Sequence, residues 1–147
     1  MTSRLAGAED RSLMPIVVDA SALVLAMLGS SPQHRALRRR LTNDSCHAPH
    51  LIDAEVGSVL RRRSLRGELP PGEAEELLVA AAPLIDHRHE MTGTVARGAW
   101  ALRQNVSFYD ALYVALALAL GTPLLTADSR LAGAPGLAVG VELLGAR

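Results

Sequence analysis

The sequence predicts an α/β domain in which helices cover both faces of a central parallel sheet. Short apolar runs of strand length alternate with longer segments of helical pattern, which is typical of parallel sheets. The chain has 147 residues, of which 49% are hydrophobic, enough for one domain with a buried core. Acidic residues stand where apolar runs end or helices begin. Because such points lie along one edge of a parallel sheet, we expect these acids to share a pocket.

The N-terminal part of this domain is expected to contain a strand and two helices. Residues 15–18 form a short apolar run that predicts a buried strand, and residues 20–28 form the helix after it. Gly29 ends that helix. A second helix over residues 32–41 begins at a proline, a residue that is favoured in the first turn of a helix.

The middle of the chain predicts two more strands and two more helices. A brief strand is expected over residues 45–48, and then a helix over residues 52–66, which Gly67 stops. Two prolines open another helix over residues 70–82. Residues 84–87 are expected to form the third strand.

The C-terminal third predicts a strong helix and the last strands. Residues 108–120 form the strongest helical pattern in the chain, and Gly121 and Pro123 end it. The other expected elements are a helix over residues 92–103, a strand over 124–126, a helical turn over 129–132 and an edge strand over 137–143.

Composition argues against several classes of protein. All 15 basic residues are arginine, whereas receiver-type phosphoacceptor domains and haloacid-dehalogenase-like phosphatases ordinarily place a lysine beside their acids. Cys46 is the only cysteine, which excludes an internal disulfide and a cysteine-based zinc cluster. A reducing, cytoplasmic setting is therefore expected. The histidines show no HExxH or similar pair of metal ligands.

The N-terminus predicts an extension ahead of the domain. Residues 1–13 are polar and aperiodic, so we expect a flexible segment there and the domain over residues 14–147. The apolar stretch over residues 13–28 is similar to a signal peptide, but Asp19 interrupts it and no small-residue cleavage site follows. The longest apolar run, over residues 111–120, is far shorter than the ~20 residues that span a bilayer. We expect a soluble protein with no membrane partner.

The acids that we expect to share the pocket are Asp19, Glu55, Asp110 and Asp128. Each has a second interpretation, because carboxylates also cap helices or stabilise their first turns. Asp19 and Asp128 follow apolar runs and precede helices, and Asp110 stands three residues after Ser107 in a pattern like a capping box. If the acids do meet, their mutual repulsion calls for a hard cation, and Mg²⁺ or Mn²⁺ is the natural inference.

The residues that flank these acids carry a family resemblance. The segments are Asp-Ala-Ser at 19–21, Glu-Val-Gly-Ser-Val-Leu-Arg at 55–61, Tyr-Asp-Ala-Leu-Tyr-Val-Ala-Leu-Ala at 109–117 and Leu-Thr-Ala-Asp-Ser-Arg-Leu at 125–131. In order, spacing and flanking residues the chain resembles the PIN-domain ribonucleases, specifically the VapC-type toxins of prokaryotic toxin–antitoxin pairs. The resemblance spans residues 14–144, and its most specific segment is 109–117.

This resemblance implies a fold, an activity and partners. The fold would be the three-layer α/β/α PIN domain with a central parallel sheet. Asp19, Glu55, Asp110 and Asp128 would be catalytic, with Asp19, Asp110 and Asp128 binding Mg²⁺ or Mn²⁺ and Ser21 as a nearby hydroxyl. The reaction would be hydrolysis of an RNA phosphodiester by an activated water. The implied partners are a cognate VapB-like antitoxin, a structured RNA substrate and a second copy of the chain in a homodimer.

An RNA substrate requires positive charge near the acids, because phosphate contacts dominate affinity for nucleic acids. At about 100° per residue, Arg62 and Arg66 lie within roughly 20° of Glu55 on the same helix face, so they are candidate phosphate contacts. The alternative is that both arginines are a solvated helix end, where basic residues are favoured in any case.

Two other functions remain open at the level of sequence. The first is a PIN-like module that binds an antitoxin and regulates expression but has little nuclease activity; the intact set of acids argues against it. The second is a small metal-dependent phosphohydrolase. That function would require a lysine at the phosphoryl group or an Asp-x-Asp motif, and residues 19–21 read Asp-Ala-Ser instead.

Overall fold

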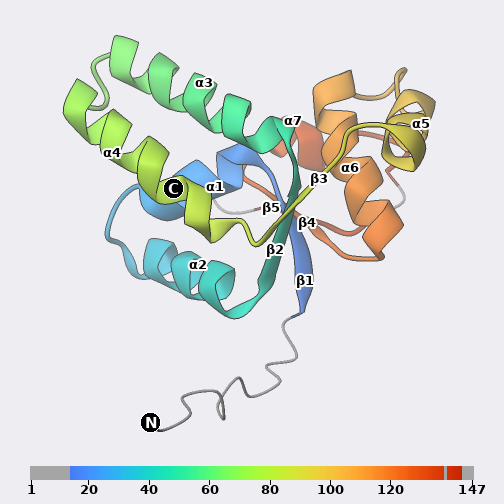
Figure 1. The fold of residues 1–147 in the computed structure, drawn as a ribbon, viewed down its shortest axis with the longest axis horizontal. Helices are drawn as coiled ribbons and strands as arrows, with labels where there is room; N and C mark the ends of the chain where they lie inside the picture. Colours follow the sequence, from blue (N-terminus) through green and yellow to red (C-terminus); the bar gives the residue numbers. More distant parts are fainter. Residues whose placement is uncertain (1–13, 138, 144–147) are drawn as a thin grey trace, which may run out of the picture.

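The computed structural model describes residues 14–137 and 139–143, and these form a parallel sheet between two layers of helices (Figure 1). In the described residues, the five strands are ordered β3-β2-β1-β4-β5 and every pair is parallel. The strands are β1 (Pro15–Val18), β2 (Ser45–Pro49), β3 (His87–His89), β4 (Leu124–Thr126) and β5 (Val141–Leu143). The predicted fold class is confirmed. The predicted extension over residues 1–13 lies outside the described residues.

Helices cover both faces of this sheet (Figure 1). They are α1 (Ala20–Met27), α2 (Pro32–Asn43), α3 (Leu51–Leu65), α4 (Pro71–Ala81), the 3₁₀ helix η1 (Ala82–Leu84), α5 (Gly93–Ala101), α6 (Phe108–Leu120) and α7 (Ser129–Ala132). The helices α1 to α4 pack together on one side, while α6 lies across β1, β2 and β4 on the other and carries α5 on its outer surface.

The core explains why these helices form where they do. The segment 111–117 of α6 is buried throughout, because this helix is apolar around most of its circumference. The helix α5 approaches it closely at Gly98, where a Cβ would lie 3.1 Å from the Cβ of Ala115. At its end, Gly121 adopts a left-handed conformation with φ 65°, which glycine adopts without steric cost.

The strand order creates a switch point beside β1. The chain continues from β1 to β2 and β3 on one side of β1, and it adds β4 and β5 on the other side. The carboxyl ends of β1 and β4 are therefore adjacent. Val18 is paired with Leu125 in the sheet register, and the Asp19 N–H donates to the Leu125 carbonyl at 3.1 Å. In open α/β sheets, ligands bind in the crevice at such a point.

Two predicted strands are wrong in position. Residues 84–87 were expected to be a strand, but residues 82–84 form η1, and β3 is instead His87–His89. The apolar side chain of Ile85 reaches the core from a turn, while the strand itself is polar. The predicted edge strand over 137–143 begins only at Val141, after a turn at Gly136 with φ 74°.

The other predicted elements are present, with boundaries that agree or shift by one or two residues. Among the helices of the described residues, none is long and apolar enough to cross a membrane.

Candidate active site

Asp19 lies at the carboxyl end of β1 and is 6% exposed. One carboxylate oxygen accepts hydrogen bonds from the backbone N–H of Ala22 at 2.9 Å and from the hydroxyl of Ser21 at 2.6 Å. The other accepts a hydrogen bond from the hydroxyl of Thr126. Asp19 therefore does cap α1, and it also faces the switch point. Burial raises the pKa of Asp19, while these three hydrogen bonds lower it and the charge of Asp110 raises it further.

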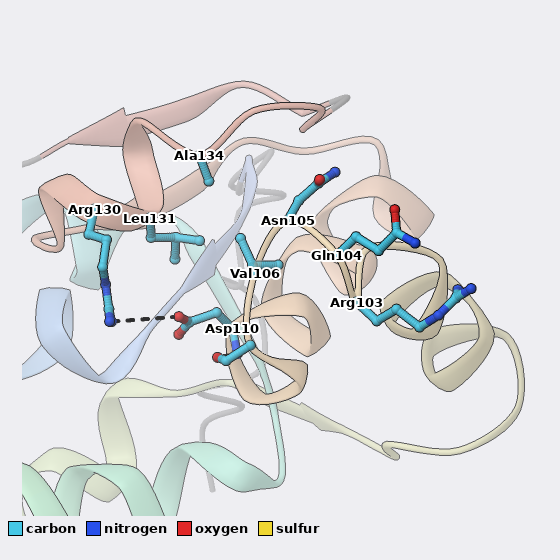
Figure 2. A pocket seen from close by; sticks show the side chains of 9 residues that line it. Arg103, Gln104, Asn105, Val106, Asp110, Arg130, Leu131 and Ala134 are labelled. Carbon is cyan, nitrogen blue, oxygen red and sulfur yellow. Dashed lines mark hydrogen bonds and ion pairs between the residues drawn. The ribbon is translucent and has the colours of Figure 1, made fainter.

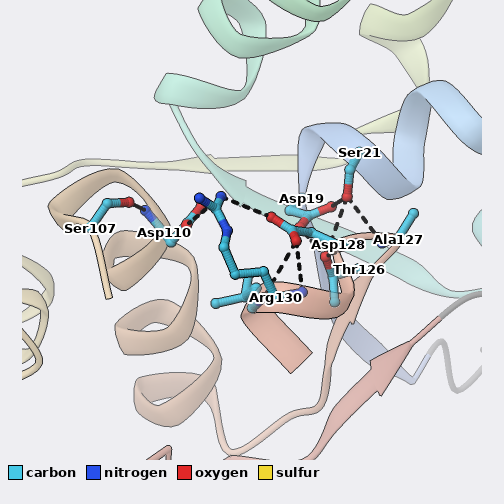
Figure 3. Close-up of polar contacts among 9 residues, drawn as sticks. Asp19, Ser21, Ser107, Asp110, Thr126, Ala127, Asp128 and Arg130 are labelled. Carbon is cyan, nitrogen blue, oxygen red and sulfur yellow. Dashed lines mark hydrogen bonds and ion pairs between the residues drawn. The ribbon is translucent and has the colours of Figure 1, made fainter. Parts of the chain in front are cut away.

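Two hydroxyls connect the start of α1 to the end of β4 and the residues that follow it (Figure 3). The Ser21 hydroxyl donates to Asp19 and accepts from the backbone N–H of Ala127 at 3.0 Å. The Thr126 hydroxyl donates to Asp19 and accepts from the backbone N–H of Asp128 at 3.0 Å. Asp19 and Asp128 are consequently held in fixed positions relative to each other. Ser21 lies where it was predicted to lie, beside Asp19, whereas sequence reasoning missed Thr126.

Asp110 and Asp128 face each other across this edge, and both also serve helix starts. The Asp110 N–H donates to the Ser107 hydroxyl at 3.2 Å at the start of α6. Asp128 caps α7, since it accepts a hydrogen bond from the Arg130 N–H at 2.9 Å. The Arg130 guanidinium extends between the two carboxylates, with Nη2 3.2 Å from Asp128 Oδ2 and 3.9 Å from Asp110 Oδ2 (Figure 3). Arg130 was also missed, although it belongs to the Leu-Thr-Ala-Asp-Ser-Arg-Leu segment.

Glu55 joins the cluster from α3. The side chain is half-buried, and desolvation raises its pKa. The charges of Asp110 and Asp19 raise this pKa further, which places all three carboxylates in one electrostatic neighbourhood. The neighbouring acid Asp53 does not join them, because it forms a bidentate ion pair with Arg88 at 2.8 and 2.9 Å.

Tyr113 contributes a buried hydroxyl to the same cluster. This residue is 1% exposed and lies on α6, one turn after Asp110. Its hydroxyl faces Glu55, but it forms no hydrogen bond of standard geometry within the described residues. Burial, and then the charge of Glu55, raise the pKa of Tyr113, so the phenol stays protonated. A buried donor without a partner is costly, which makes this point of the pocket suited to an additional oxygen ligand such as water.

The donors in this cluster fit a hard cation. Asp19, Asp110 and Asp128 supply carboxylate oxygens, the ligands that Mg²⁺ and Mn²⁺ prefer. Within the described residues no three acidic, histidine or cysteine side chains are close enough to enclose an ion together. Mg²⁺ is usually bound through one or two carboxylates and several waters, so an open arrangement suits it. A cation bound there would offset the electrostatic repulsion between these carboxylates, which favours its binding.

The two predicted phosphate contacts lie on the outer part of α3. Arg62 is exposed, and its charge lowers the pKa of Glu55, so the two side chains share a face of the helix. Arg66 is exposed at the C-cap of α3. Among the ion pairs of the described residues, neither arginine is paired with an acid.

The chain is similar to known proteins across most of its length. Residues 16–137 match the family described as PIN domain. The chain is 49% identical to Ribonuclease VapC1 of Mycobacterium tuberculosis over 128 aligned residues. These residues make up 87% of this chain and 96% of that protein.

Two solved structures share the fold at lower identity. VapBC2 from Rickettsia felis, bound to a DNA fragment from its promoter, has a TM-score of 0.66 at 13% identity and covers 90% of this chain and 100% of that one. VapC20 of Mycobacterium tuberculosis, described as a Sarcin-Ricin loop cleaving toxin, has a TM-score of 0.60 at 18% identity, with coverage of 84% and 96%.

Proposed function

The chain belongs to the PIN-domain family and is a ribonuclease of the VapC type, and we propose that its acidic cluster is a Mg²⁺- or Mn²⁺-dependent catalytic site. The observation that carries this proposal is the convergence of Asp19, Asp110 and Asp128 at the switch point, with Glu55 close enough to interact with two of them. Helix capping alone does not require acids from β1, α3, α6 and β4 to meet at one place.

The acids have distinct roles in this proposal. Asp19, Asp110 and Asp128 hold the cation, which when bound would lower the pKa of a water molecule and neutralise charge on the scissile phosphate. Glu55 takes a proton from the attacking water, a role that its raised pKa favours. Ser21 and Thr126 orient the Asp19 carboxylate through their hydrogen bonds.

The substrate is RNA, and a folded RNA suits this surface better than a bare single strand. Aromatic residues make up only 3% of the chain, so base stacking contributes little to recognition. VapC20, which shares the fold, is described as a Sarcin-Ricin loop cleaving toxin, and a structured RNA is proposed for this chain. Arg62 and Arg66 would contact its phosphates from the face of α3 that carries Glu55.

A VapB-like antitoxin is the proposed partner that keeps the enzyme inactive in the cytoplasm, and the enzyme is proposed to be a homodimer. VapBC2, which shares the fold, is described as bound to a DNA fragment from its promoter, and VapBC-5 as a member of the VapBC family of toxin-antitoxin systems. A regulatory module with little nuclease activity is not favoured, because the chain has all four acids.

The test combines growth and cleavage. Induced without an antitoxin, the wild-type chain should arrest bacterial growth, and the purified protein should cleave RNA with Mn²⁺ but not with EDTA. Asp19→Asn and Asp110→Asn keep side-chain shape while removing charge, so both should lose arrest and cleavage. Asp53→Asn is the matched control and should stay active, because Asp53 is paired with Arg88. Full toxicity of Asp19→Asn or Asp110→Asn at equal expression would show that the assigned role of that residue is wrong.

A further inference from the structure

A cavity adjoins the acidic cluster. It has a volume of about 420 Å³ and lies between the loop that joins α5 to α6 and the start of α7 (Figure 2). Asp110 and Arg130, which belong to the acidic cluster, also line this cavity. Anything bound in it therefore lies directly beside the proposed cation site. Its size is within the range of pockets that hold small organic molecules.

The lining of this cavity has the mixed chemistry of a nucleotide site. Arg130 supplies positive charge, whereas Arg103 lines the cavity with its guanidinium turned onto Trp100, and Gln104 and Asn105 supply side-chain amides. Apolar side chains such as Leu131 complete the wall. Guanidinium groups suit a phosphate, an amide can donate to and accept from a base edge, and apolar atoms can contact a base face.

The loop that carries the amides is held in place by its own hydrogen bonds. The N–H groups of Asn105 and Val106 both donate to the carbonyl of Leu102, at 2.9 and 3.2 Å. The guanidinium of Arg103 donates to the carbonyl of Trp100 at 3.1 Å and lies 5.1 Å from the centre of the Trp100 ring. These contacts fix the backbone of the loop, so the loop itself needs little ordering to bind a ligand.

Asn105 is the amide with the most defined surroundings. A Cβ on Gly136 would lie 2.7 Å from Asn105 Nδ2, so the turn at Gly136 brings main chain up against the amide. Gly136 has φ 74°, which favours glycine, and any side chain there would collide with the amide. Within the described residues, no hydrogen bond to the Asn105 side chain satisfies the standard geometric criteria, and the side chain is exposed.

We propose that this cavity holds the nucleotide next to the cleaved phosphodiester and that Asn105 recognises its base. The proposal rests on the proposed ribonuclease function, since it assigns a substrate subsite to the same enzyme. A carboxamide presents a donor and an acceptor side by side, and this pattern matches a base edge that offers an acceptor next to a donor, as adenine does. Arg130, on the opposite wall, would contact the phosphate.

The test is the base preference at each position around the cut. An RNA hairpin pool with a fully randomised loop is digested in Mn²⁺, and the new ends are sequenced. Wild type should favour one base at a position beside the cut, and Asn105→Ala should reduce that preference about tenfold. Asn105→Asp replaces the donor by an acceptor, so it should shift preference toward bases that present a donor. The control is Asn43→Ala, an exposed asparagine at the end of α2, which should keep the wild-type preference.

Two outcomes separate this proposal from the proposed function. If wild type cleaves the pool and Asn105→Ala leaves every base frequency unchanged, the subsite is wrong and the ribonuclease function stands. If wild type fails to cleave, the subsite is tested by RNA binding instead. The Asp19→Asn protein should bind the same pool more tightly than the double variant that also carries Asn105→Ala. Equal affinities would overturn the subsite. Thermal melting of both Asn105 variants should match wild type, because the side chain is exposed.

Discussion

Arg130 contacts Asp128 twice, through its backbone and through its side chain. The Arg130 N–H donates to Asp128 Oδ1 at 2.9 Å, and the guanidinium Nη2 lies 3.2 Å from Oδ2 of the same carboxylate. The guanidinium also lies 3.9 Å from Asp110. One cation of the chain itself thus offsets part of the repulsion between two carboxylates that are proposed to bind a metal. A divalent ion has to compete with this guanidinium for the same oxygens.

Removing that competitor should strengthen metal binding. Arg130→Ala is expected to increase the affinity for Mn²⁺ by up to about fivefold, since exposed ion pairs contribute about 0.2–1 kcal/mol. Isothermal titration of Mn²⁺ into the metal-free protein measures this. Arg39→Ala removes an exposed arginine on α2 and is the control for net charge. Unchanged or weaker binding in Arg130→Ala would contradict the competition.

Tyr113→Phe tests whether the buried hydroxyl forms a hydrogen bond. Because Tyr113 Oη lacks a partner of standard geometry in the described residues, its removal should leave the free energy of unfolding unchanged or raise it by up to about 1 kcal/mol. Urea unfolding of the metal-free protein gives the value. Tyr109→Phe, on the exposed part of the same helix, is the control. A loss of more than about 1 kcal/mol would show that the hydroxyl does bond to Glu55.

Asp19 should make the stability of the metal-free protein depend on pH. The pKa of Asp19 is raised above 3.8 in the folded state, so the folded protein binds this proton more tightly than the unfolded chain does. The contribution of the neutral carboxyl is fully present below pH 3.8 and is lost as pH rises through the raised pKa. Asp19→Asn cannot titrate there, so its stability relative to wild type should increase with pH across that window. Urea unfolding at several pH values checks this, and a difference that falls with pH would contradict it.

Arg62 and Arg66 should affect RNA affinity without affecting the metal. Replacing both by alanine should flatten the dependence of log K on log salt by roughly one unit for each lost phosphate contact. Filter binding of an uncleaved RNA to the Asp19→Asn protein at several salt concentrations gives the slope, and Mn²⁺ binding by the otherwise wild-type double variant should stay the same. Arg39→Ala is again the control. An unchanged slope would assign both arginines to a solvated helix end.

The places of three of the acids in the fold could be predicted, because each follows a strand or opens a helix. Asp19 and Asp128 follow apolar strands and start helices, and Asp110 follows Ser107, so their positions at the sheet edge followed from pattern alone. Asp19 and Asp128 cap helices and also face the cluster, and Asp110 lies in the first turn of α6, so the two interpretations of these three residues were not exclusive.

Contacts between distant segments could not be predicted in the same way. Thr126 and Arg130 matter because β4 lies beside β1, and strand order is not encoded in periodicity. The strand β3 consists of polar residues, His87–His89, that pair with β2, whereas the apolar residues just before it form η1 and a turn. The predicted strand over 84–87 therefore began too early: Leu84 lies in η1, Ile85 is buried, and pairing with β2 starts at Asp86, whose N–H donates to the Cys46 carbonyl at 2.9 Å.

The central claim is that the acidic cluster binds a divalent cation, and the stability of Asp110→Asn with and without Mn²⁺ tests it most directly. At a metal concentration about 100 times the dissociation constant, wild type should gain about 2.7 kcal/mol. Asp110→Asn should lose most of this gain, yet without metal it should be at least as stable as wild type, because one repelling charge is gone. Asn caps helices about as well as Asp, so a pure capping role predicts the wild-type response to Mn²⁺. A full Mn²⁺-induced stabilisation of Asp110→Asn would contradict the account.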